Sequence, residues 1–349
     1  MKVKRSSDKN TTNKLEKEIL KNLIFESIDN HILNTWRIRY AIGTVASIIL
    51  IVGLCSYYYN SPSESIIDFV KSSKKSNVND YEDVLLILGE GENLKIEEEI
   101  TTINYSSTGE KVTIGNTKKI NQVAIKKNKT VYNSLLVPYG KRSKIHLSDG
   151  STVWLNSGSK LIYPAVFNGD KREVYIEGEA VFDVKHNQEK PFIVFSENQE
   201  TEVLGTVFGI TNYLDENHID TFLKSGSVLI SYKDKSQNIS TDKLKISPGT
   251  LASFNKETKS IISNKVNVDN YFSWIDGILI FKNNDLEFIT KRLSRFYNID
   301  ITINDIQLKK ETFSGYLNLN ENINKVIQNI KESTNMEYTF NGNKIIISN

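Results

Sequence analysis

The longest apolar stretch of the chain runs from Tyr40 to Tyr59 and carries no charged side chain. About 20 apolar residues are what an α-helix needs to cross the hydrocarbon core of a bilayer. Arg37 and Arg39 precede the stretch, and the tyrosines at 57–59 suit the far headgroup layer, where amphipathic rings concentrate. A cleaved signal peptide fits poorly, because the stretch begins deep in the chain and ends without a small-residue cleavage site. The pattern predicts a single transmembrane helix over 40–59.

The distribution of basic residues predicts how this helix is oriented. Residues 1–39 contain nine Lys and Arg side chains, whereas the comparable stretch after the apolar run offers only Lys71, Lys74 and Lys75. Basic residues are enriched in the cytoplasmic loops of membrane proteins. We therefore expect a single-pass protein of the inner membrane, with a cytoplasmic tail over 1–39 and the bulk of the chain in the periplasm.

The tail has a helical pattern of its own between Lys14 and Trp36, where apolar side chains recur every four or five residues. Asn13, with Glu16 three residues later, predicts a capping box at the helix start. The apolar stripe of this helix comprises Leu15, Ile19, Leu23, Ile28, Ile32 and Trp36. Such a stripe favours either self-association and contact with the membrane surface or the groove of a cytoplasmic partner.

Beyond the apolar run the pattern becomes one of short, alternating strands. Residues 60–79 are interpreted as a polar linker, and two similar β-hairpins are predicted at 84–96 and 145–155, the second around an Asp-Gly turn. No helical period of useful length appears between Tyr81 and Phe254. The pattern predicts an all-β domain over 80–254, an antiparallel roll or sandwich. Its further strands are expected at 162–167, 173–176, 181–184, 192–195, 203–211 and 227–232.

The period changes again after a second polar linker, predicted at 255–270. Over 271–349, Asn284 and Glu287 predict another capping box, and apolar residues at helical spacing follow them. Together with a second helix around 323–330, the order is β-α-β-β-α-β-β, a split βαβ module. The fold class is therefore mixed: an N-terminal helix, a transmembrane helix, an all-β domain and a C-terminal α+β module.

Composition and charge exclude several classes of function. The 349 residues carry a formal net charge of +2, so nothing in the balance of charges calls for direct binding of nucleic acid. The single cysteine, Cys55, lies in the apolar run, so the exported part has to rely on a hydrophobic core rather than on disulfides. The four histidines lack the spacing of metal ligands, and neither a metal nor another cofactor is expected.

Carboxylates near Gly178 are the only candidates for acid–base catalysis that the pattern offers. Glu177, Glu179 and Asp183 could form a glycosidase pair, but acids beside a glycine are interpreted here as turn residues exposed to solvent. We therefore predict no catalytic residue and no enzyme activity.

Aromatic residues support an alternative function. Trp154, Tyr163 and Tyr175 could form a platform for a sugar, although aromatic residues in strands more often belong to the core. The alternative is a membrane-anchored, β-rich periplasmic module that binds glycan or another envelope component.

A series of short blocks follows in order from Val137 onward: VPYG (137–140), LSDG (147–150), VWLNSGS (153–159), YP (163–164), REVY (172–175), EGEAVF (177–182), KPF (190–192), VLGT (203–206) and GSV (226–228). Together these blocks resemble the FecR family of single-pass anti-sigma factors. The C-terminal module is similar to the companion domain of this family, which resembles the short N-terminal domain of secretins and TonB-dependent receptors. Trp274-Ile275-Asp276-Gly277 with Phe281 and Leu286 is its entry signature.

The resemblance implies a regulator of transcription that works by cell-surface signalling. Its cytoplasmic tail would hold an extracytoplasmic-function sigma factor, and its periplasmic part would contact the signalling domain of an outer-membrane TonB-dependent transporter. The tail is about half as long as the resemblance leads us to expect. The hypothesis is therefore a helix-in-groove contact with the sigma factor, made by Leu15, Ile19, Leu23, Ile32 and Trp36.

The resemblance also draws attention to Gly205 and Thr206, since some members of the family cleave themselves at a Gly-Thr bond. A Thr hydroxyl can attack the preceding carbonyl where Gly permits a strained backbone. The favoured interpretation is that Gly205 permits a bulge in a strand.

Overall fold

The structure of the protein is a computed structural model that describes residues 9–59, 65–73, 77–89, 91–126, 129–197, 199–233, 241–334 and 336–349. Within these ranges it leaves out the side chains at 9–15, 29–35, 37–38, 56–59, 233 and 241–242. The chain divides into two compact units, residues 1–62 and residues 63–349.

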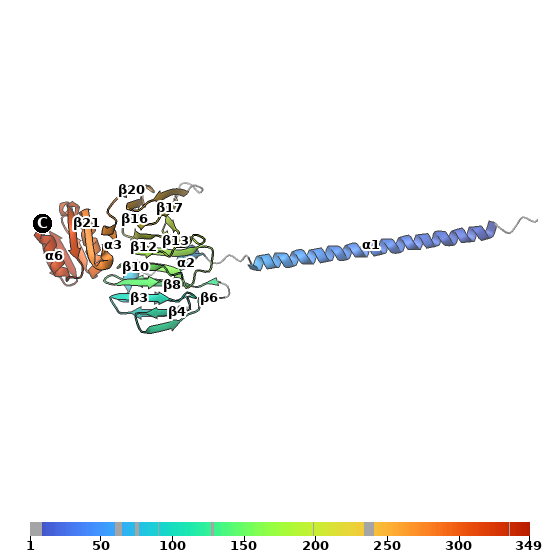
Figure 1. Cartoon of the computed structure of the whole chain (residues 1–349), viewed down its shortest axis with the longest axis horizontal. Coiled ribbons are helices and arrows are strands. Elements are labelled where there is room, and N and C mark those ends of the chain that lie inside the picture. Colours follow the sequence, from blue (N-terminus) through green and yellow to red (C-terminus); the bar gives the residue numbers. More distant parts are fainter. Residues whose placement is uncertain are drawn as a thin grey trace, which may run out of the picture. The chain divides into compact units, whose positions relative to one another are not determined.

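The first unit is built on one continuous helix, α1 (Lys9–Tyr59), of 51 residues (Figure 1). Sequence analysis predicts two separate segments here, but the helical backbone passes through both without a break. It begins at Lys9, so the predicted capping box at Asn13 and Glu16 is wrong. In the part of the chain whose residues are described, no helix combines the length and the apolar composition that crossing a membrane requires.

The second unit contains a large β domain. Among the described residues, eighteen strands are hydrogen-bonded into one continuous sheet that folds into two layers. In order across the first layer they are β2 (Asn93–Ile96), β1 (Val84–Ile87), β8 (Tyr132–Val137), β11 (Ser159–Pro164), β12 (Arg172–Asp183), β13 (Phe192–Ser196), β14 (Gln199–Val203), β17 (Val228–Lys233) and β18 (Thr241–Ile246).

The second layer shares β12 with the first. Its strands, in order, are β5 (Lys118–Asn121), β4 (Lys111–Ile114), β3 (Ile100–Tyr105), β9 (Arg142–His146), β10 (Thr152–Leu155), β12, β15 (Val207–Asn212), β16 (His218–Ser225), β19 (Thr250–Asn255) and β20 (Ile261–Lys265). The pairings are antiparallel except for β3 with β9 and β12 with β13, which are parallel. A short hairpin of β6 (Ile125–Lys126) and β7 (Lys129–Thr130) stands apart. The predicted β-rich architecture is confirmed, and both predicted hairpins form as β1–β2 and β9–β10.

Strand β12 joins the two layers because it turns a corner at Gly178. Up to Glu177 it pairs with β11 and β13, and from Gly178 onward it pairs with β10 and β15. Gly178 has a φ of +89°, and a Cβ placed there would lie 2.6 Å from the Cα of Ser159. Only glycine tolerates both conditions. The predicted pair of strands with a turn between them is thus one strand of 12 residues.

The core of the β domain fills the space between the layers. Strand residues that point inward alternate with more exposed ones, as in β9 and β10. Phe182 and Phe208 stack in this core with ring centroids 5.1 Å apart. Each fully buried side chain of this size stabilises the fold by roughly 1.5–3 kcal/mol.

Two segments that sequence analysis interprets as linkers belong to the folded unit. Helix α2 (Ile66–Ser72), followed by the 3₁₀ helix η1 (Val78–Asp80), begins at Ser65, whose hydroxyl accepts a hydrogen bond from the backbone of Asp68. Ile66 is fully buried and packs with Tyr132 and other side chains of the first layer. In the second linker, β20 extends the sheet beside β19.

The C-terminal module has a second core of its own, distinct from that of the β domain. Its elements are α3 (Asp269–Phe272), the 3₁₀ helix η2 (Ser273–Asp276), β21 (Ile278–Asp285), α4 (Leu286–Tyr297), β22 (Asp300–Ile303), α5 (Ile306–Lys310), β23 (Thr312–Asn318), α6 (Ile323–Glu332), β24 (Glu337–Asn341) and β25 (Lys344–Ser348). β21 pairs with β23, and β22, β25 and β24 form a three-stranded sheet.

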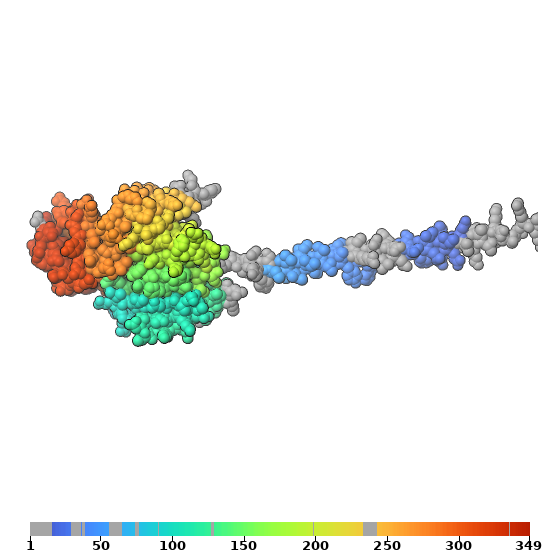
Figure 2. Space-filling model, in the orientation of Figure 1, coloured from blue at the N-terminus to red at the C-terminus, as the bar shows by residue number. Residues whose placement is uncertain are grey.

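From β21 onward the module follows the predicted order of strands and helices, with the short helix α5 in addition. The N-cap of α4 is Asp285, whose carboxylate accepts a hydrogen bond of 2.7 Å from the backbone N–H of Phe288. The predicted cap at Asn284 is therefore wrong by one residue. In Figure 2 the module, coloured orange to red, packs directly against the β domain.

Candidate functional site

The β domain and the C-terminal module meet along a surface, called here the junction, that is apolar on one side. Phe222 of β16 lies between residues of α3: it stacks on Tyr271 with centroids 5.2 Å apart and meets Phe272 edge-on at 5.3 Å. Val181 and Trp274 complete this small cluster. Because these side chains are buried together, the module is held to the β domain by apolar contact.

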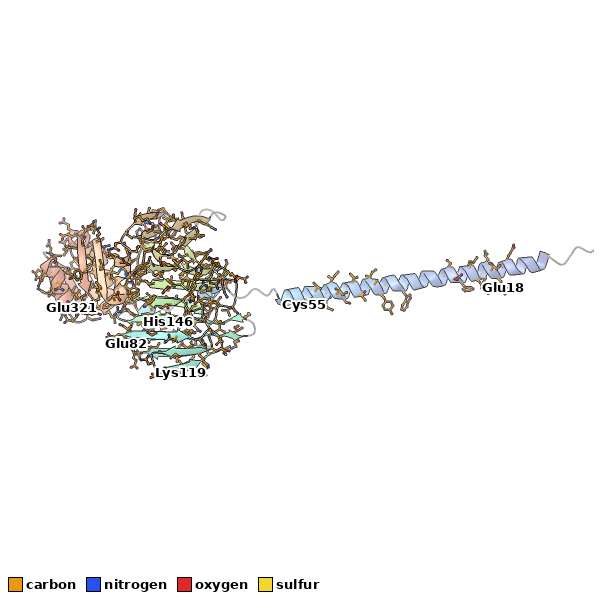
Figure 3. The ribbon with its side chains drawn as sticks, viewed as in Figure 1. Glu18, Cys55, Glu82, Lys119, His146 and Glu321 are labelled. Carbon is orange, nitrogen blue, oxygen red and sulfur yellow. The ribbon has the colours of Figure 1, made fainter. Side chains whose placement is uncertain are left out.

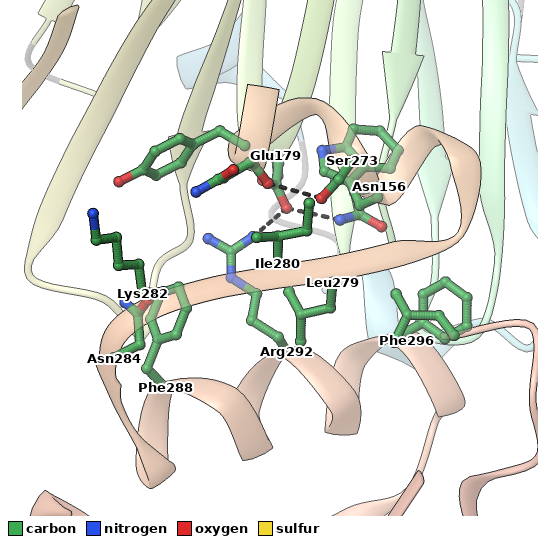
Figure 4. Close-up of a pocket in the computed structure, with 14 residues that line it drawn as sticks. Asn156, Glu179, Ser273, Leu279, Ile280, Lys282, Asn284, Phe288, Arg292 and Phe296 are labelled. Atoms are coloured by element: carbon green, nitrogen blue, oxygen red, sulfur yellow. Dashed lines mark hydrogen bonds and ion pairs between the residues drawn. The ribbon is translucent and has the colours of Figure 1, made fainter. Parts of the chain in front are cut away.

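The polar side of the junction centres on Glu179, which follows the corner of β12 (Figure 4). Its side chain is only 1% exposed. The carboxylate accepts hydrogen bonds from Nη1 of Arg292 on α4, at 2.5 Å, and from Nδ2 of Asn156, at 2.7 Å. Thr211 lies at 3.4 Å from the second carboxylate oxygen. A carboxylate of the β domain is thus neutralised by a guanidinium of the other module.

The electrostatics of Arg292 follow from this pairing. Burial, the largest influence, acts to lower the pKa of Arg292, but the Glu179 carboxylate and the nearby Glu216 and Tyr213 outweigh it, so the pKa lies above its usual range. The cation also lies over the ring of Phe288, at 5.0 Å from the centroid. Removal of one partner would leave a buried charge uncompensated, which is far more costly than loss of an exposed pair.

A second arginine of α4, Arg295, binds another part of the β domain. Its Nη2 contacts both carboxylate oxygens of Asp215, at 2.8 and 2.9 Å, and its Nη1 donates to Glu216 at 2.5 Å. The guanidinium lies 3.7 Å from the ring centroid of Tyr213. Such a forked contact fixes orientation as well as distance.

Tyr213 is itself tied to the β domain. Its hydroxyl donates to the backbone carbonyl of Ser157 at 2.9 Å, and burial, with the charge of Glu179, raises the pKa of Tyr213 well above its usual range. Tyr213 therefore offers Arg295 an uncharged aromatic face.

A third arginine crosses the junction in the opposite direction. Arg142 of β9 donates to the backbone carbonyl of Trp274 at 3.0 Å and lies over the ring of Phe296, 4.7 Å from its centroid. Burial lowers the pKa of Arg142, and the charge of Glu99 partly opposes this effect. The backbone N–H of Gly140 donates to the carbonyl of Arg295 at 2.9 Å. The two modules therefore hold each other by side-chain and backbone hydrogen bonds.

A cavity of about 100 Å³ remains within the junction. Glu179, Trp274, Phe288 and Arg292 are among the residues that line it, as the close-up in Figure 4 shows. Among the described residues, the Nε1 of Trp274 and the Nε of Arg292 have no hydrogen-bond partner. The junction therefore contains two buried donors that the packing of the described residues leaves unsatisfied.

Sequence analysis misinterprets Glu179. It expects an exposed turn residue, but Gly178 is a corner inside a strand, and Glu179 is buried beyond it. The sequence around the arginines of α4 does not predict their role either, because they lie where the polar face of an amphipathic helix is expected. Only the packing of α4 against the β domain distinguishes Arg292 and Arg295 from ordinary surface arginines.

The predicted sigma-binding residues lie on α1 and are only partly described. Ile19, Leu23 and Trp36 are 53%, 57% and 56% exposed, whereas the side chains of Leu15 and Ile32 lie outside the described residues. Further apolar side chains of the same helix, which the predicted list of contact residues omits, are also exposed: Leu20, Ile24, Phe25 and Ile28. The apolar surface around 19–28 is therefore wider than a single stripe.

Gly205 and Thr206 lie between β14 and β15, so the single strand predicted at 203–211 is interrupted there. Thr206 is buried, and its hydroxyl donates to the backbone carbonyl of Ser227 at 3.1 Å. Gly205 packs so closely on His186 that a Cβ would lie 2.6 Å from the His186 Cα. The irregular register falls between Val207 and Phe208, just beyond the predicted bulge.

The possible sugar platform is not assembled in this structure. Tyr163 is fully buried, and its hydroxyl shares a hydrogen bond of 2.9 Å with that of Tyr105. Tyr175 is 8% exposed. The half-buried Trp154, with the ammonium of Lys144 at 5.1 Å from its ring, is the member that retains a partly open face. The interpretation of the two tyrosines as core residues is confirmed.

Figure 3 labels His146, in the β domain, and Cys55, on α1. His146, at the end of β9, is hydrogen-bonded to Thr152 at 2.9 Å, and burial lowers its pKa. Cys55 is an exposed free cysteine of α1. In the described ranges, no cluster of His, Cys, Asp and Glu is arranged to hold a metal ion.

A β-rich domain joined through a structured junction to a split βαβ module defines a two-module architecture, and sequence comparison gives the family. Residues 134–229 match the family model described as FecR protein, and residues 278–347 match the one described as FecR, C-terminal. The chain belongs to the FecR family, as its sequence blocks predict.

Solved structures agree with this assignment. Two crystal structures of a protein from Parabacteroides distasonis ATCC 8503, at 1.65 and 2.50 Å, are similar to this chain, with 25% identity and a TM-score of 0.56 each. That protein is provisionally described as an anti-sigma factor. The similarity covers 61% and 62% of this chain, and 97% and 98% of the other. No curated protein matches the chain.

Proposed function

We propose that this protein is a single-pass anti-sigma factor of the inner membrane that relays the state of an outer-membrane TonB-dependent transporter to transcription. The observation that carries the anti-sigma role is the match of two successive segments to the two FecR family models, together with the likeness to a crystal structure described as an anti-sigma factor. The membrane span, the sigma factor and the transporter are the finer parts of the proposal.

The apolar run over 40–59 supports the membrane span. It contains no charge, and side chains such as Ile48, Ile49 and Leu50 on α1 are 59–66% exposed. Exposed apolar side chains all round a helix need an apolar environment. The basic residues of 1–39 support a cytoplasmic N-terminus and a periplasmic position for the larger unit.

The apolar side chains of the tail support a contact with an extracytoplasmic-function sigma factor. Ile19 and Leu23 are more than half exposed, and they lie one helical turn apart. Side chains four residues apart lie on the same helix face, as helix-in-groove binding requires.

The test of sigma binding is co-purification from the native cells. The full-length chain, tagged at its C-terminus and extracted in detergent, is expected to recover an extracytoplasmic-function sigma factor that mass spectrometry identifies. The double substitution Ile19→Asp and Leu23→Asp should abolish recovery, because it places two charges in the apolar contact.

The matched control is the double substitution Lys17→Asp and Lys21→Asp, which introduces the same residue type on the opposite helix face and should preserve recovery. Equal recovery of the sigma factor by both variants would overturn the assignment of the contact residues. Failure of the wild-type chain to recover any sigma factor would count against the proposed function.

The junction supports the relay. A transporter's signalling domain that binds the C-terminal module or the β domain would act on two modules joined by Arg292 and Arg295, so it could change their relative arrangement. A ligand shifts an equilibrium between two arrangements of the modules only by its difference in affinity for them. Buried ion pairs across the junction make the alternatives discrete rather than continuous.

Self-cleavage at the Gly205–Thr206 bond is the less favoured hypothesis for this site. The Thr206 hydroxyl donates to the carbonyl of Ser227, which supports a structural role for this side chain. We expect the purified chain to run as a single full-length band, and two fragments that disappear on Thr206→Val substitution would show that expectation to be wrong.

A further inference from the structure

A second cavity of the β domain lies away from the junction, where several turns meet at one end of the sandwich. Its volume is about 230 Å³. Ser148 and Asp149 contribute from the β9–β10 turn, Arg172 from the start of β12, and Lys185 and Lys190 from the segment between β12 and β13. The described lining residues therefore include one arginine, two lysines and a histidine, but a single carboxylate.

Arg172 is built into this cavity rather than placed on the surface. Its side chain is only 2% exposed, and its position is fixed by hydrogen bonds to the carbonyls of Lys190 (2.9 Å) and Lys185 (2.7 Å) and to Asp149 (2.8 Å). These contacts use Nε and Nη1. Among the described residues, Nη2 has no hydrogen-bond partner.

The hydroxyl of Ser148 is a second unsatisfied group of the same cavity. It is buried and likewise has no partner among the described residues. A buried donor without a partner is costly, and a buried guanidinium nitrogen is more so. The lining therefore presents two donors for which its described residues supply no acceptor.

The charge balance indicates which kind of acceptor fits. Asp149 is already engaged by Arg172 and by the hydroxyl and backbone N–H of Ser151, and its single charge offsets the two lysines only in part. The ammonium of Lys190 donates to the carbonyl of Phe167 at 2.7 Å, which leaves two of its N–H groups for another acceptor. A neutral occupant would leave these charges uncompensated, whereas an oxyanion would satisfy them.

Positive charge is also crowded around Lys190. Burial and then the charge of Arg172 lower the pKa of this ammonium, and Asp170 and Asp149 only partly offset them. A bound anion would relieve the repulsion.

We propose that this cavity binds a single oxyanion group, with Nη2 of Arg172, the hydroxyl of Ser148 and the ammonium of Lys190 as donors. The group has the size of phosphate, sulfate or a carboxylate. It would be free in the periplasm or presented by a larger molecule, and the cavity recognises the shared oxygen chemistry. The cavity is separate from the junction, and the inference does not depend on the sigma factor or the transporter.

The test is calorimetric titration of the full-length chain in detergent with inorganic phosphate, sulfate and acetate, against chloride at matched ionic strength. We expect saturable binding of at least one of the three anions. Binding of phosphate and sulfate without acetate would indicate a tetrahedral group, and binding of acetate as well would indicate a carboxylate. Both patterns support the proposal.

Two substitutions locate the binding. Lys190→Gln should weaken the affinity by about tenfold or more, since it removes a charge-assisted hydrogen bond, and Ser148→Ala should weaken it by a smaller factor. Lys245→Gln removes the same charge from an exposed position of β18 and should leave the affinity unchanged. Circular dichroism and the melting temperature of each variant establish that it is folded.

Three results would overturn the proposal. The first is the absence of saturable binding for all three anions, which would mean that ordered water alone satisfies Arg172 and Ser148. The second is an unchanged affinity in folded Lys190→Gln. The third is an equal loss in Lys190→Gln and Lys245→Gln, which would mark non-specific attraction to positive charge.

Discussion

The largest differences between the predictions from sequence and the structure concern single residues. Glu179 stands beside a glycine and reads as a solvent-exposed turn residue, yet it is a buried acceptor for Arg292 and Asn156. The pattern had the right local feature, a glycine that bends the backbone. It could not show that the bend points the carboxylate toward another module, because that depends on which surface packs there.

Asp220 of β16 allows a prediction about pH. Burial, the largest influence, raises the pKa of its carboxyl, while a hydrogen bond from Ser253 and the charges of His218 and Arg292 lower it in part. One of its carboxylate oxygens has no partner among the described residues. Since the folded pKa lies above the unfolded one, the stability contributed by this group is present below the unfolded pKa and is lost as the pH rises through the folded pKa.

Asp220→Asn is therefore expected to raise the melting temperature at pH 7. Each pKa unit of difference between the folded and unfolded states corresponds to about 1.4 kcal/mol. The gain should shrink as the pH falls toward the ordinary pKa of an aspartate, about 4, because a raised pKa lets the wild-type carboxyl take up its proton before that point. Thermal unfolding at the two pH values measures this, with Asp183→Asn, at an exposed position of β12, as control. A gain that is equal at both pH values would contradict the explanation.

At the scale of the element, β12 decides the architecture of the β domain. One strand of 12 residues serves both layers, and the change of layer occurs at Gly178. The predictions for the helices are partly right and partly wrong. The apolar faces of α4 and α6 follow from their spacing, whereas the cap of α4 is Asp285 rather than its neighbour. Two adjacent residues of capping type cannot be told apart until the end of the preceding strand is known.

Gly178→Ala is expected to destabilise the β domain by more than about 1 kcal/mol, because it combines a left-handed backbone with a steric clash. The added methyl group would lie 2.5 Å from the hydroxyl oxygen of Ser159. Gly169→Ala is the matched control, since a Cβ there meets no atom within 4 Å. Urea unfolding followed by circular dichroism compares the two variants. Equal stability of both would show that β12 does not depend on the corner.

At the scale of the whole molecule, the junction makes one unit of two modules that have separate cores. Arg292 and Arg295 come from the C-terminal module and bind acceptors of the β domain, whereas Arg142 comes from the β domain and binds the carbonyl of Trp274. Arg292 and Glu179 are 113 residues apart, and Arg295 and Asp215 are 80 apart. The apolar cluster around Phe222 holds the two modules together, but apolar contact does not by itself fix their orientation. The ion pairs fix how the two modules are oriented.

Breaking the central ion pair is expected to loosen this junction. Arg292→Met should cost about 3–5 kcal/mol, because it leaves the Glu179 carboxylate buried and unpaired. The double variant Arg292→Met with Glu179→Gln should recover part of the loss, since no uncompensated charge remains. Urea unfolding gives the energies, and limited proteolysis within 266–277 reports separation of the modules.

The control for this cycle is the exposed pair of Lys331 and Glu337 in the C-terminal module. Lys331→Met should cost no more than about 1 kcal/mol, as is usual for exposed pairs. Additive effects of Arg292→Met and Glu179→Gln would show that the two side chains do not act as a pair.

The sequence by itself determined those features of the protein that depend on near neighbours along the chain. The alternation around Asp149-Gly150 predicts a β-hairpin, helical spacing predicts α4, and the ordered blocks from Val137 onward predict the FecR family; each is confirmed. These patterns depend on residues that are close together in the chain, so they can be recognised in a single sequence. Only the tertiary structure decided what Glu179, Arg292, Arg295 and Arg172 do. Their partners are distant in sequence, and a charged side chain costs so much to bury that its role depends on which partner the fold provides.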